Sequence, residues 1–113
     1  MRPVESGLEG KASIVTGAGS GIGRAIAQAL AARRAAVCIA DINLEAARTV
    51  ASEIERANGR AIAIRADVSQ RAQVQTLVGE TVRAFGRLDV LVNNAGLQFI
   101  APVQEFPEEK WDS

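Results

Sequence analysis

The sequence of 113 residues contains no tyrosine and no histidine, and it has a single cysteine, Cys38. One cysteine excludes a disulfide within the chain. Its place in an apolar run predicts a thiol packed in a strand, which suits a reducing, cytoplasmic location. Tyrosine and histidine are frequent proton carriers in enzymes, so their absence leaves few side chains for acid–base catalysis.

The sequence also lacks long apolar runs and an excess of either charge. No segment approaches the roughly 20 apolar residues of a membrane span, and residues 1–11 contain no apolar stretch of signal-peptide length. The 13 basic and 13 acidic residues cancel, and the tight basic clustering is limited to Arg33 and Arg34. We expect no nucleic-acid partner, no membrane partner and no metal, and we expect small molecules or other protein chains as partners.

What is present is the composition of one globular domain covering residues 1–113. Hydrophobic residues make up 48% of the chain and charged residues 23%. Short β-branched runs alternate with longer segments of helical period. We predict strands at residues 12–16, 36–40, 61–65 and 88–92.

Three helices are predicted between these strands, because apolar residues recur there at intervals of three and four. Asn43 and Ser69 are expected to cap the second and third helices, which end at Asn58-Gly59 and at Gly86. Pro107 predicts the first turn of a further helix. Arg34 breaks a local rule, because the turn after the first helix favours glycine, and we expect modest backbone strain there.

Strict alternation of strand and helix predicts an α/β fold with parallel strands joined by right-handed crossovers. The expected architecture is a partial Rossmann-like, doubly wound parallel sheet with the strand order 3-2-1-4. We expect the sheet to stop after the fourth strand and to leave that strand as an unpaired edge.

A glycine-rich segment, residues 16–23, follows the first predicted strand and opens the first helix. Gly17 permits the tight turn, Gly21 lets the backbone approach a pyrophosphate, and Gly23 allows close packing of the helix. The helix N-terminus offers N–H groups and a positive dipole to phosphates. A phosphate loop of the NTPase kind is excluded, because no Gly-Lys-Ser/Thr sequence ends the segment.

Acidic residues follow the second and third strands. Asp41 is placed to accept hydrogen bonds from the adenosine ribose and to repel a 2'-phosphate. Neither Ser20 nor Ile42 supplies a cation for that phosphate, so NAD is favoured over NADP. Asp67 has two interpretations: its carboxylate accepts a bond from the adenine amino group, or it forms an Asx turn before the third helix.

Two adjacent amides, Asn93 and Asn94, end the fourth strand before Ala95 and Gly96, and each amide needs a partner if buried. These motifs together resemble the short-chain dehydrogenase/reductase family, from Lys11 onward. The resemblance implies that the cofactor-binding residues are those of the loop, the acidic strand ends and the Asn-Asn-Ala-Gly motif: Gly17, Ser20, Gly21, Ile22, Gly23, Asp41, Asp67, Val68, Asn93, Ala95 and Gly96.

Residues 93–98 and 101–112 are similar, more narrowly, to bacterial D-3-hydroxybutyrate dehydrogenases, in which a glutamine after this motif helps to hold the substrate carboxylate. That similarity implies a substrate-binding role for Gln98, although Phe99 departs from the histidine often found next. The family's proton-transfer unit is a serine, a tyrosine and a lysine. This chain has no tyrosine, and neither of its lysines, Lys11 and Lys110, can fill that role, so the resemblance implies that no catalytic residue lies in this chain.

We therefore expect an NAD-dependent oxidoreductase acting on a secondary alcohol such as 3-hydroxybutyrate, homo-oligomeric at full length and cut before its catalytic residues. Three alternatives stay open. The first is a binding module that holds a dinucleotide without turnover. The second is a short-chain reductase with another substrate, such as a 3-oxoacyl thioester. The third is a methyltransferase, which the Asn-Asn-Ala-Gly strand end disfavours.

Overall fold

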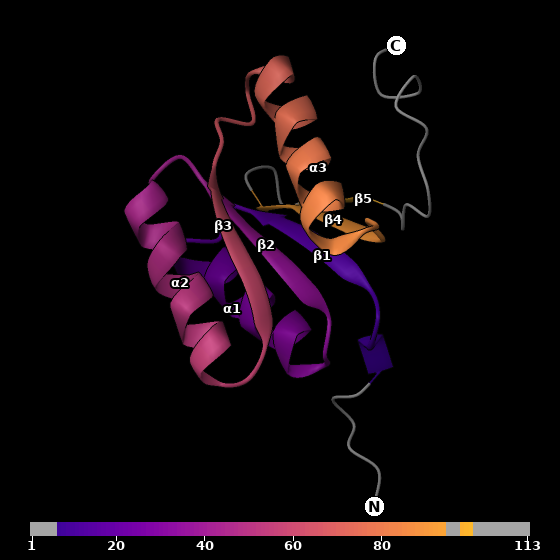
Figure 1. Cartoon of the computed structure of the whole chain (residues 1–113). Helices are drawn as coiled ribbons and strands as arrows, with labels where there is room; N and C mark the ends of the chain where they lie inside the picture. The colour runs from indigo at the N-terminus through magenta and orange to yellow at the C-terminus, as the bar shows by residue number, and fades with distance from the viewer. Residues whose placement is uncertain (1–6, 95–97, 101–113) are drawn as a thin grey trace, which may run out of the picture.

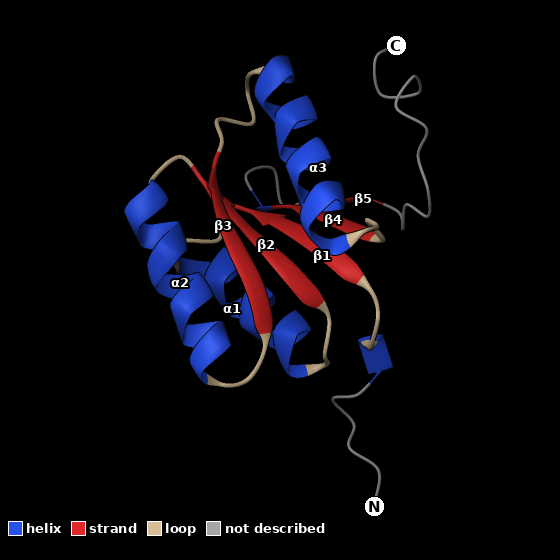
Figure 2. Ribbon diagram, in the orientation of Figure 1, coloured by secondary structure: helices blue, strands red, loops and turns tan. Residues whose placement is uncertain are grey.

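The computed structural model describes residues 7–94 and, as backbone, residues 98–100. A central sheet carries helices on both faces (Figures 1 and 2). The elements, in chain order, are β1 (Ala12–Thr16), α1 (Gly21–Ala32), β2 (Ala36–Asp41), α2 (Leu44–Arg56), β3 (Arg60–Arg65), α3 (Arg71–Phe85), β4 (Val90–Asn93) and β5 (Gln98–Ile100).

The strand order is β3-β2-β1-β4-β5, and the first four of these strands run parallel. The doubly wound order 3-2-1-4 is thus confirmed. The edge of the sheet differs from expectation, because β5 pairs with β4 in antiparallel register and Gln98 lies opposite Asn93. The prediction that the sheet stops after its fourth strand, and that this strand is an unpaired edge, was wrong. Residues 98–100 of β5 pair with residues 91–93 of that edge.

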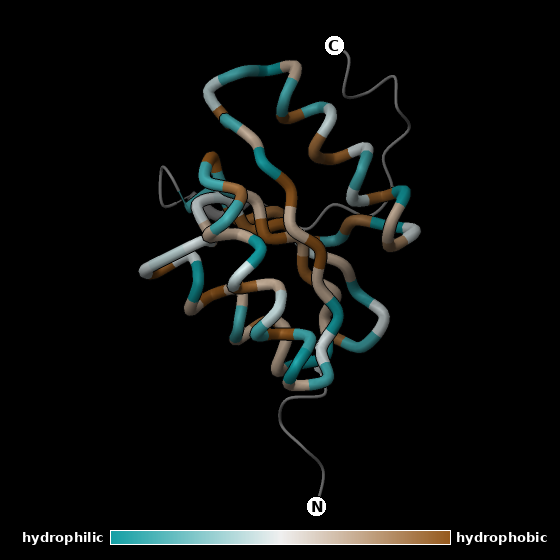
Figure 3. Tube along the Cα trace, turned by 60° about the vertical axis from the view of Figure 1, so that its left-hand side comes forward, coloured by the Kyte–Doolittle hydropathy of each residue, from teal (hydrophilic) through white to brown (hydrophobic). Residues whose placement is uncertain are grey.

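Alternate residues of the central strands face two separate cores. One core joins α1 and α2 to Val15, Val37 and Ile39, all with no exposed surface. The other joins α3 to Ile14 and Cys38. Figure 3 shows the apolar stretches concentrated along the strands and along the inner sides of the helices. Burial on both faces explains why the strands are continuous apolar runs without a polar alternation.

Most of the expected helix ends are confirmed. The Asn43 side chain accepts a hydrogen bond from the Ala46 N–H at 3.1 Å and caps α2. Asn58 and Gly86 end α2 and α3 in left-handed backbone, with φ of 71° and 86°. Arg34, which follows α1, has φ of 78°, so the expected strain is present.

Two local expectations were wrong. Ser69 does not cap α3, whose N-cap is Gln70, because the Ser69 hydroxyl donates instead to the Asp67 carboxylate at 2.7 Å. The fourth strand begins at Val90 and not at residue 88, because Asp89 is held by side-chain bonds to Arg87 and to the Ala12 N–H. In both places a polar side chain takes a partner that apolar periodicity does not reveal. The helix expected at Pro107 lies outside the described residues.

Within residues 7–94, no helix combines the length and the apolar character needed to cross a bilayer.

Candidate cofactor site

The glycine loop between β1 and α1 has the geometry that its sequence predicts. Gly17 and Gly21 adopt φ of 62° and 59°, which side chains rarely tolerate. A Cβ on Gly23 would overlap the carbonyl oxygen of Gly17 and would lie 2.9 Å from Asn94 Nδ2. Gly23 therefore brings the first turn of α1 against the loop itself and against the end of β4.

The N-terminus of α1 fits an anionic group. Ser20 is its N-cap, but the Ser20 side chain makes no capping hydrogen bond, and the first turn contains no acidic residue. The space beside Gly21 is open, since no other atom lies within 4 Å of where its Cβ would be. Ile22 is 62% exposed next to that space. Uncapped N–H groups and the helix dipole make this end suitable for the pyrophosphate of a dinucleotide.

Asp41, at the end of β2, ties the glycine loop to the next helix. Its Oδ2 accepts the Gly19 N–H at 2.9 Å, and its Oδ1 accepts the Asn43 N–H at 2.9 Å. A Cβ on Gly19 would lie 2.9 Å from that Oδ2 and 2.7 Å from Ala46 Cβ. The sequence did not single out Gly19. The position of Gly19 within the glycine loop could have indicated its role, because a side chain there would displace the loop from the Asp41 carboxylate.

Asp67 forms the Asx turn that the sequence allowed. Its Oδ1 accepts hydrogen bonds from the N–H and the hydroxyl of Ser69, at 3.0 and 2.7 Å. These bonds, the hydroxyl bond first, hold the pKa of Asp67 below its usual value. The Asp67 N–H donates to Gln73 Oε1 at 2.7 Å, which fixes the turn to α3. Val68 follows, half-buried. The adenine contact of Asp67 stays a prediction.

Thr16, which the sequence reasoning missed, joins the loop to β4. Its hydroxyl lies 3.2 Å from Asn93 Oδ1 and accepts the Asn94 N–H at 3.0 Å. Asn94 Nδ2 donates to the Gly17 carbonyl at 3.3 Å, while Asn94 Oδ1 is buried without a hydrogen bond. Asn94 thus braces the loop through its Nδ2, whereas the expectation that each buried amide is satisfied is not met at its Oδ1.

A second missed residue, Asp89, closes the opposite end of the sheet. It is 5% exposed, and its Oδ2 accepts the Ala12 N–H at 2.9 Å. Arg87 binds both carboxylate oxygens, at 2.7 and 2.6 Å. Burial acts to raise the pKa of Asp89, but the bonds to Arg87 and Ala12 and the charges of Arg87 and Lys11 outweigh it and lower the pKa.

The structure therefore brings together the loop residues, Asp41 and Asn93 at the carboxyl ends of the strands, where open α/β sheets bind ligands. Asp67 and Val68 follow β3, which ends at Arg65. Gln98 lies in β5, opposite Asn93 in register, whereas Ala95 and Gly96 lie outside the described residues.

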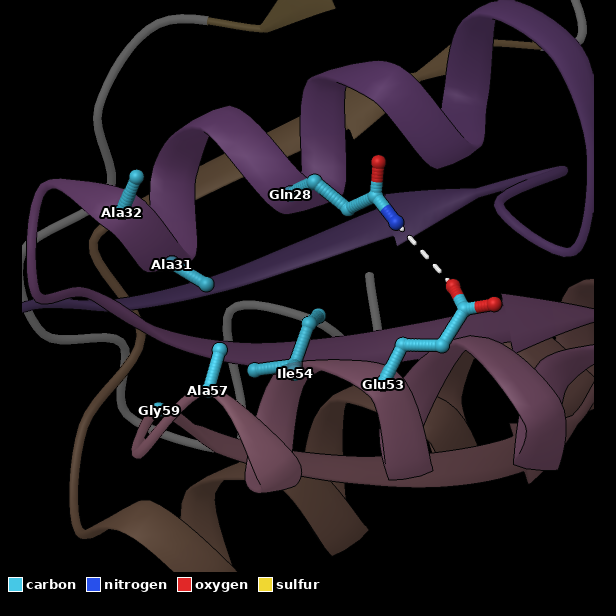
Figure 4. Close-up of a pocket in the computed structure, with 7 residues that line it drawn as sticks. All are labelled: Gln28, Ala31, Ala32, Glu53, Ile54, Ala57 and Gly59. Carbon is cyan, nitrogen blue, oxygen red and sulfur yellow. Dashed lines mark hydrogen bonds between the residues drawn. The ribbon is translucent and has the colours of Figure 1, made fainter.

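A separate cleft of about 230 Å³ lies between the later turns of α1 and α2, away from the loop. Figure 4 shows the Gln28 and Glu53 side chains pointing toward each other across it, with Ala31, Ile54 and Ala57 to one side. Gln28 Nε2 donates to Glu53 Oε1 at 3.0 Å.

The strand order, the glycine loop and the carboxylate of Asp41 at the end of β2 together define a dinucleotide-binding α/β protein. Residues 11–113 match the short chain dehydrogenase family, and the chain belongs to it. It is 47% identical over 105 residues to a sorbitol dehydrogenase of Cereibacter sphaeroides, covering 93% of this chain and 40% of that protein. It is 41% identical over 106 residues to a D-threitol dehydrogenase of Mycolicibacterium smegmatis, covering 94% and 41%.

Among solved structures, a short-chain dehydrogenase/reductase from Burkholderia phymatum in complex with NAD superposes with a TM-score of 0.72 at 37% identity. The match covers 74% of this chain and 30% of that one. The chain spans about two fifths of the length of the curated relatives it matches.

Proposed function

We propose that the whole protein is an NAD-dependent oxidoreductase that interconverts a secondary alcohol and its ketone, and that residues 1–113 supply its cofactor-binding part. The observation that carries the proposal is Asp41, whose two oxygens are oriented by the Gly19 and Asn43 N–H groups at the mouth of the loop. A carboxylate so fixed accepts ribose hydroxyls and repels an added phosphate.

Bound nicotinamide cofactor supplies hydride exchange. This chain's residues hold and orient it: the N–H groups at the start of α1, Ser20 to Gly23, take the pyrophosphate, and Asp41 takes the ribose. By the family resemblance, Asp67 and Val68 would flank the adenine. Asn93, together with Ala95 and Gly96, which lie outside the described residues, would contact the nicotinamide side.

The family resemblance implies that proton transfer to or from the substrate oxygen uses a tyrosine beside a lysine, and this chain has no tyrosine. We expect residues 1–113 alone to bind NAD without oxidising alcohols. Absorbance of reduced nicotinamide, followed with NAD and D-3-hydroxybutyrate, tests this. Turnover that survives repeated purification would contradict it.

Two substrate classes are proposed. The residues around Gln98 support 3-hydroxybutyrate, whose carboxylate an amide can bind. The names of the sorbitol and D-threitol relatives support a polyol instead. The whole protein, assayed with both and with its Gln98→Ala variant, separates them. A rise in KM confined to 3-hydroxybutyrate supports the first, and unchanged kinetics with preference for a polyol supports the second.

The cofactor proposal is tested by calorimetry with NAD and NADP. We expect NAD to bind more tightly than NADP. The Asp41→Ala substitution should reduce the difference between their binding free energies by about 1 to 3 kcal/mol, the scale of a charge-assisted hydrogen bond. Arg65 is paired in register with Asp41, so it is a cation close to the ribose end. Asp41→Ala with Arg65→Gln should lose any affinity for NADP gained by the single variant. Tighter NADP binding by the parent would refute the proposal.

A second function, dinucleotide binding without turnover, is favoured if the whole protein binds NAD but oxidises none of these alcohols. Location in the cytoplasm and assembly as a homo-oligomer are proposed with the enzymatic function, and fractionation and light scattering test them.

A further inference from the structure

The amino ends of the strands, at the opposite edge of the sheet from the glycine loop, form a small basic pocket. Lys11 precedes β1, and Arg60 begins β3. These two side chains and Arg34 line a pocket of about 100 Å³, which Gly10, Ala12, Ala36 and Phe85 complete. No acidic side chain is among the lining residues.

Arg60 is held in place before any ligand arrives. Its Nη2 donates to the Ala84 carbonyl at 3.0 Å, and its guanidinium carbon lies 4.9 Å from the centre of the Phe85 ring. A guanidinium carries five N–H donors, so one such bond leaves donors for a ligand. Stacking on the ring restricts the side chain, so less entropy is lost on binding.

Arg34 occupies this pocket at a conformational cost. Its φ of 78° is one that glycine adopts freely and that a long side chain disfavours. Its backbone N–H donates to Ala31 O at 2.9 Å, so the turn itself needs only the main chain. The turn uses this left-handed backbone but does not require an arginine, which is a reason to look for a role of the side chain.

Neutralising partners are few at this edge. Within residues 7–94, Lys11, Arg34 and Arg60 form no ion pair. The nearby carboxylate of Asp89 feels the charge of Lys11, but Arg87 already binds both of its oxygens. The pocket therefore concentrates positive charge in a chain whose net charge is zero.

We propose that Lys11, Arg34 and Arg60 form a binding site for a single phosphate group, separate from the dinucleotide site. A water occupies about 30 Å³ of liquid, so the pocket has room for a phosphate group but not for a dinucleotide. A phosphate dianion presents several oxygens to three cations, and guanidinium groups match its geometry with paired N–H donors. The group belongs to inorganic phosphate or to a small phosphomonoester.

The test uses ¹⁵N-labelled full chain titrated with inorganic phosphate and, separately, with glycerol phosphate, at ionic strength held constant with sodium chloride. We expect shifts of the backbone amides of Gly10, Lys11 and Ala36 that saturate. Because phosphate also has access to the glycine loop, amides 19–23 are followed as reporters of that second site. Tighter binding of one ligand identifies the source of the phosphate group.

Two variants test whether phosphate binds in this pocket. Arg34→Gln should weaken binding about fivefold, as the loss of one solvent-screened charge at contact distance implies. Arg48→Gln, an exposed arginine of α2 outside the pocket, should leave binding unchanged. Shifts confined to residues 19–23, or equal affinities in the two variants, would overturn the proposal.

The Arg34→Gly variant separates loss of the site from misfolding, because a misfolded protein would lose stability together with phosphate binding. It should weaken phosphate binding while raising the thermal midpoint in chloride buffer, because it removes the left-handed strain together with the charge. Asn58→Gly is the matched control, since Asn58 ends α2 in the same conformation with φ of 71°. It should leave phosphate binding unchanged. Unchanged binding in Arg34→Gly would refute the site.

Discussion

The carboxyl and amino ends of the sheet are held together by different kinds of contact. At the carboxyl end, glycines allow close approach, as where Gly23 meets the Gly17 carbonyl, and the carboxylate of Asp41 is tied only to backbone N–H groups. At the amino end, side chains close the structure: Asp89 binds Arg87 and the Ala12 N–H. The difference teaches that the ligand end is braced by backbone N–H groups and by uncharged side chains such as Thr16 and Asn94, whereas the other end is closed by a charged pair of side chains.

The largest effect should come from the carboxyl end. Gly23→Ala places a Cβ where the Gly17 carbonyl oxygen lies, so either the loop or the helix must move. We expect the free energy of unfolding to fall by about 3 kcal/mol, the upper range for overpacking, and NAD binding to be lost. Urea unfolding and calorimetry measure the two effects.

Gly79→Ala is the matched control for that prediction. Gly79 is a helical glycine of α3 whose Cβ would meet nothing within 4 Å. The helix propensity of alanine should therefore raise stability by about 1 kcal/mol. Equal losses in the two variants would mean that close packing at Gly23 is not the cause.

At the amino end, Asp89→Asn should lower the free energy of unfolding by about 2 kcal/mol, because bonds to charged groups are lost and Arg87 loses its counter-ion. The pKa of Asp89 is lower in the folded state than in the unfolded state. Its contribution is therefore complete above the unfolded pKa and is lost as pH falls through the folded pKa.

The pH dependence provides the check. Parent and Asp89→Asn stabilities should converge as the pH is lowered through the acid range, and NAD affinity near neutral pH should be similar. A constant difference in stability across that range would show that the carboxylate charge is not responsible.

The smallest effect concerns the turns that follow the three helices. The same left-handed backbone is occupied by Arg34, Asn58 and Gly86. Arg34→Gly should raise stability by about 1 kcal/mol, and Asn58→Gly by less, because asparagine tolerates this region better than arginine. Thermal unfolding in chloride buffer ranks the two. A larger gain for Asn58→Gly would contradict the interpretation of Arg34 as strained.

The sequence was sufficient for the sheet order and for the loop, because strand–helix alternation and glycine spacing act over short distances. The sequence was insufficient where two hydrogen-bond partners lie far apart along the chain. Thr16 and Asn93 are 77 positions apart, and so are Ala12 and Asp89, so no local pattern announces either bond. Ser69 failed as a cap because the carboxylate of Asp67, two residues earlier, competes for its hydroxyl. The hairpin to β5 was missed because β5 is only three residues long.

The bond network of Thr16 also has a kinetic meaning. The glycine loop looks local in sequence, yet its support from Asn93 and Asn94 requires β4 to lie beside β1, and three crossover helices separate these two strands along the chain. Closing so long a loop is slow compared with forming a helix. The cofactor pocket is therefore completed late in folding, and a ligand that binds only the completed pocket stabilises the docked chain over its partly folded precursors.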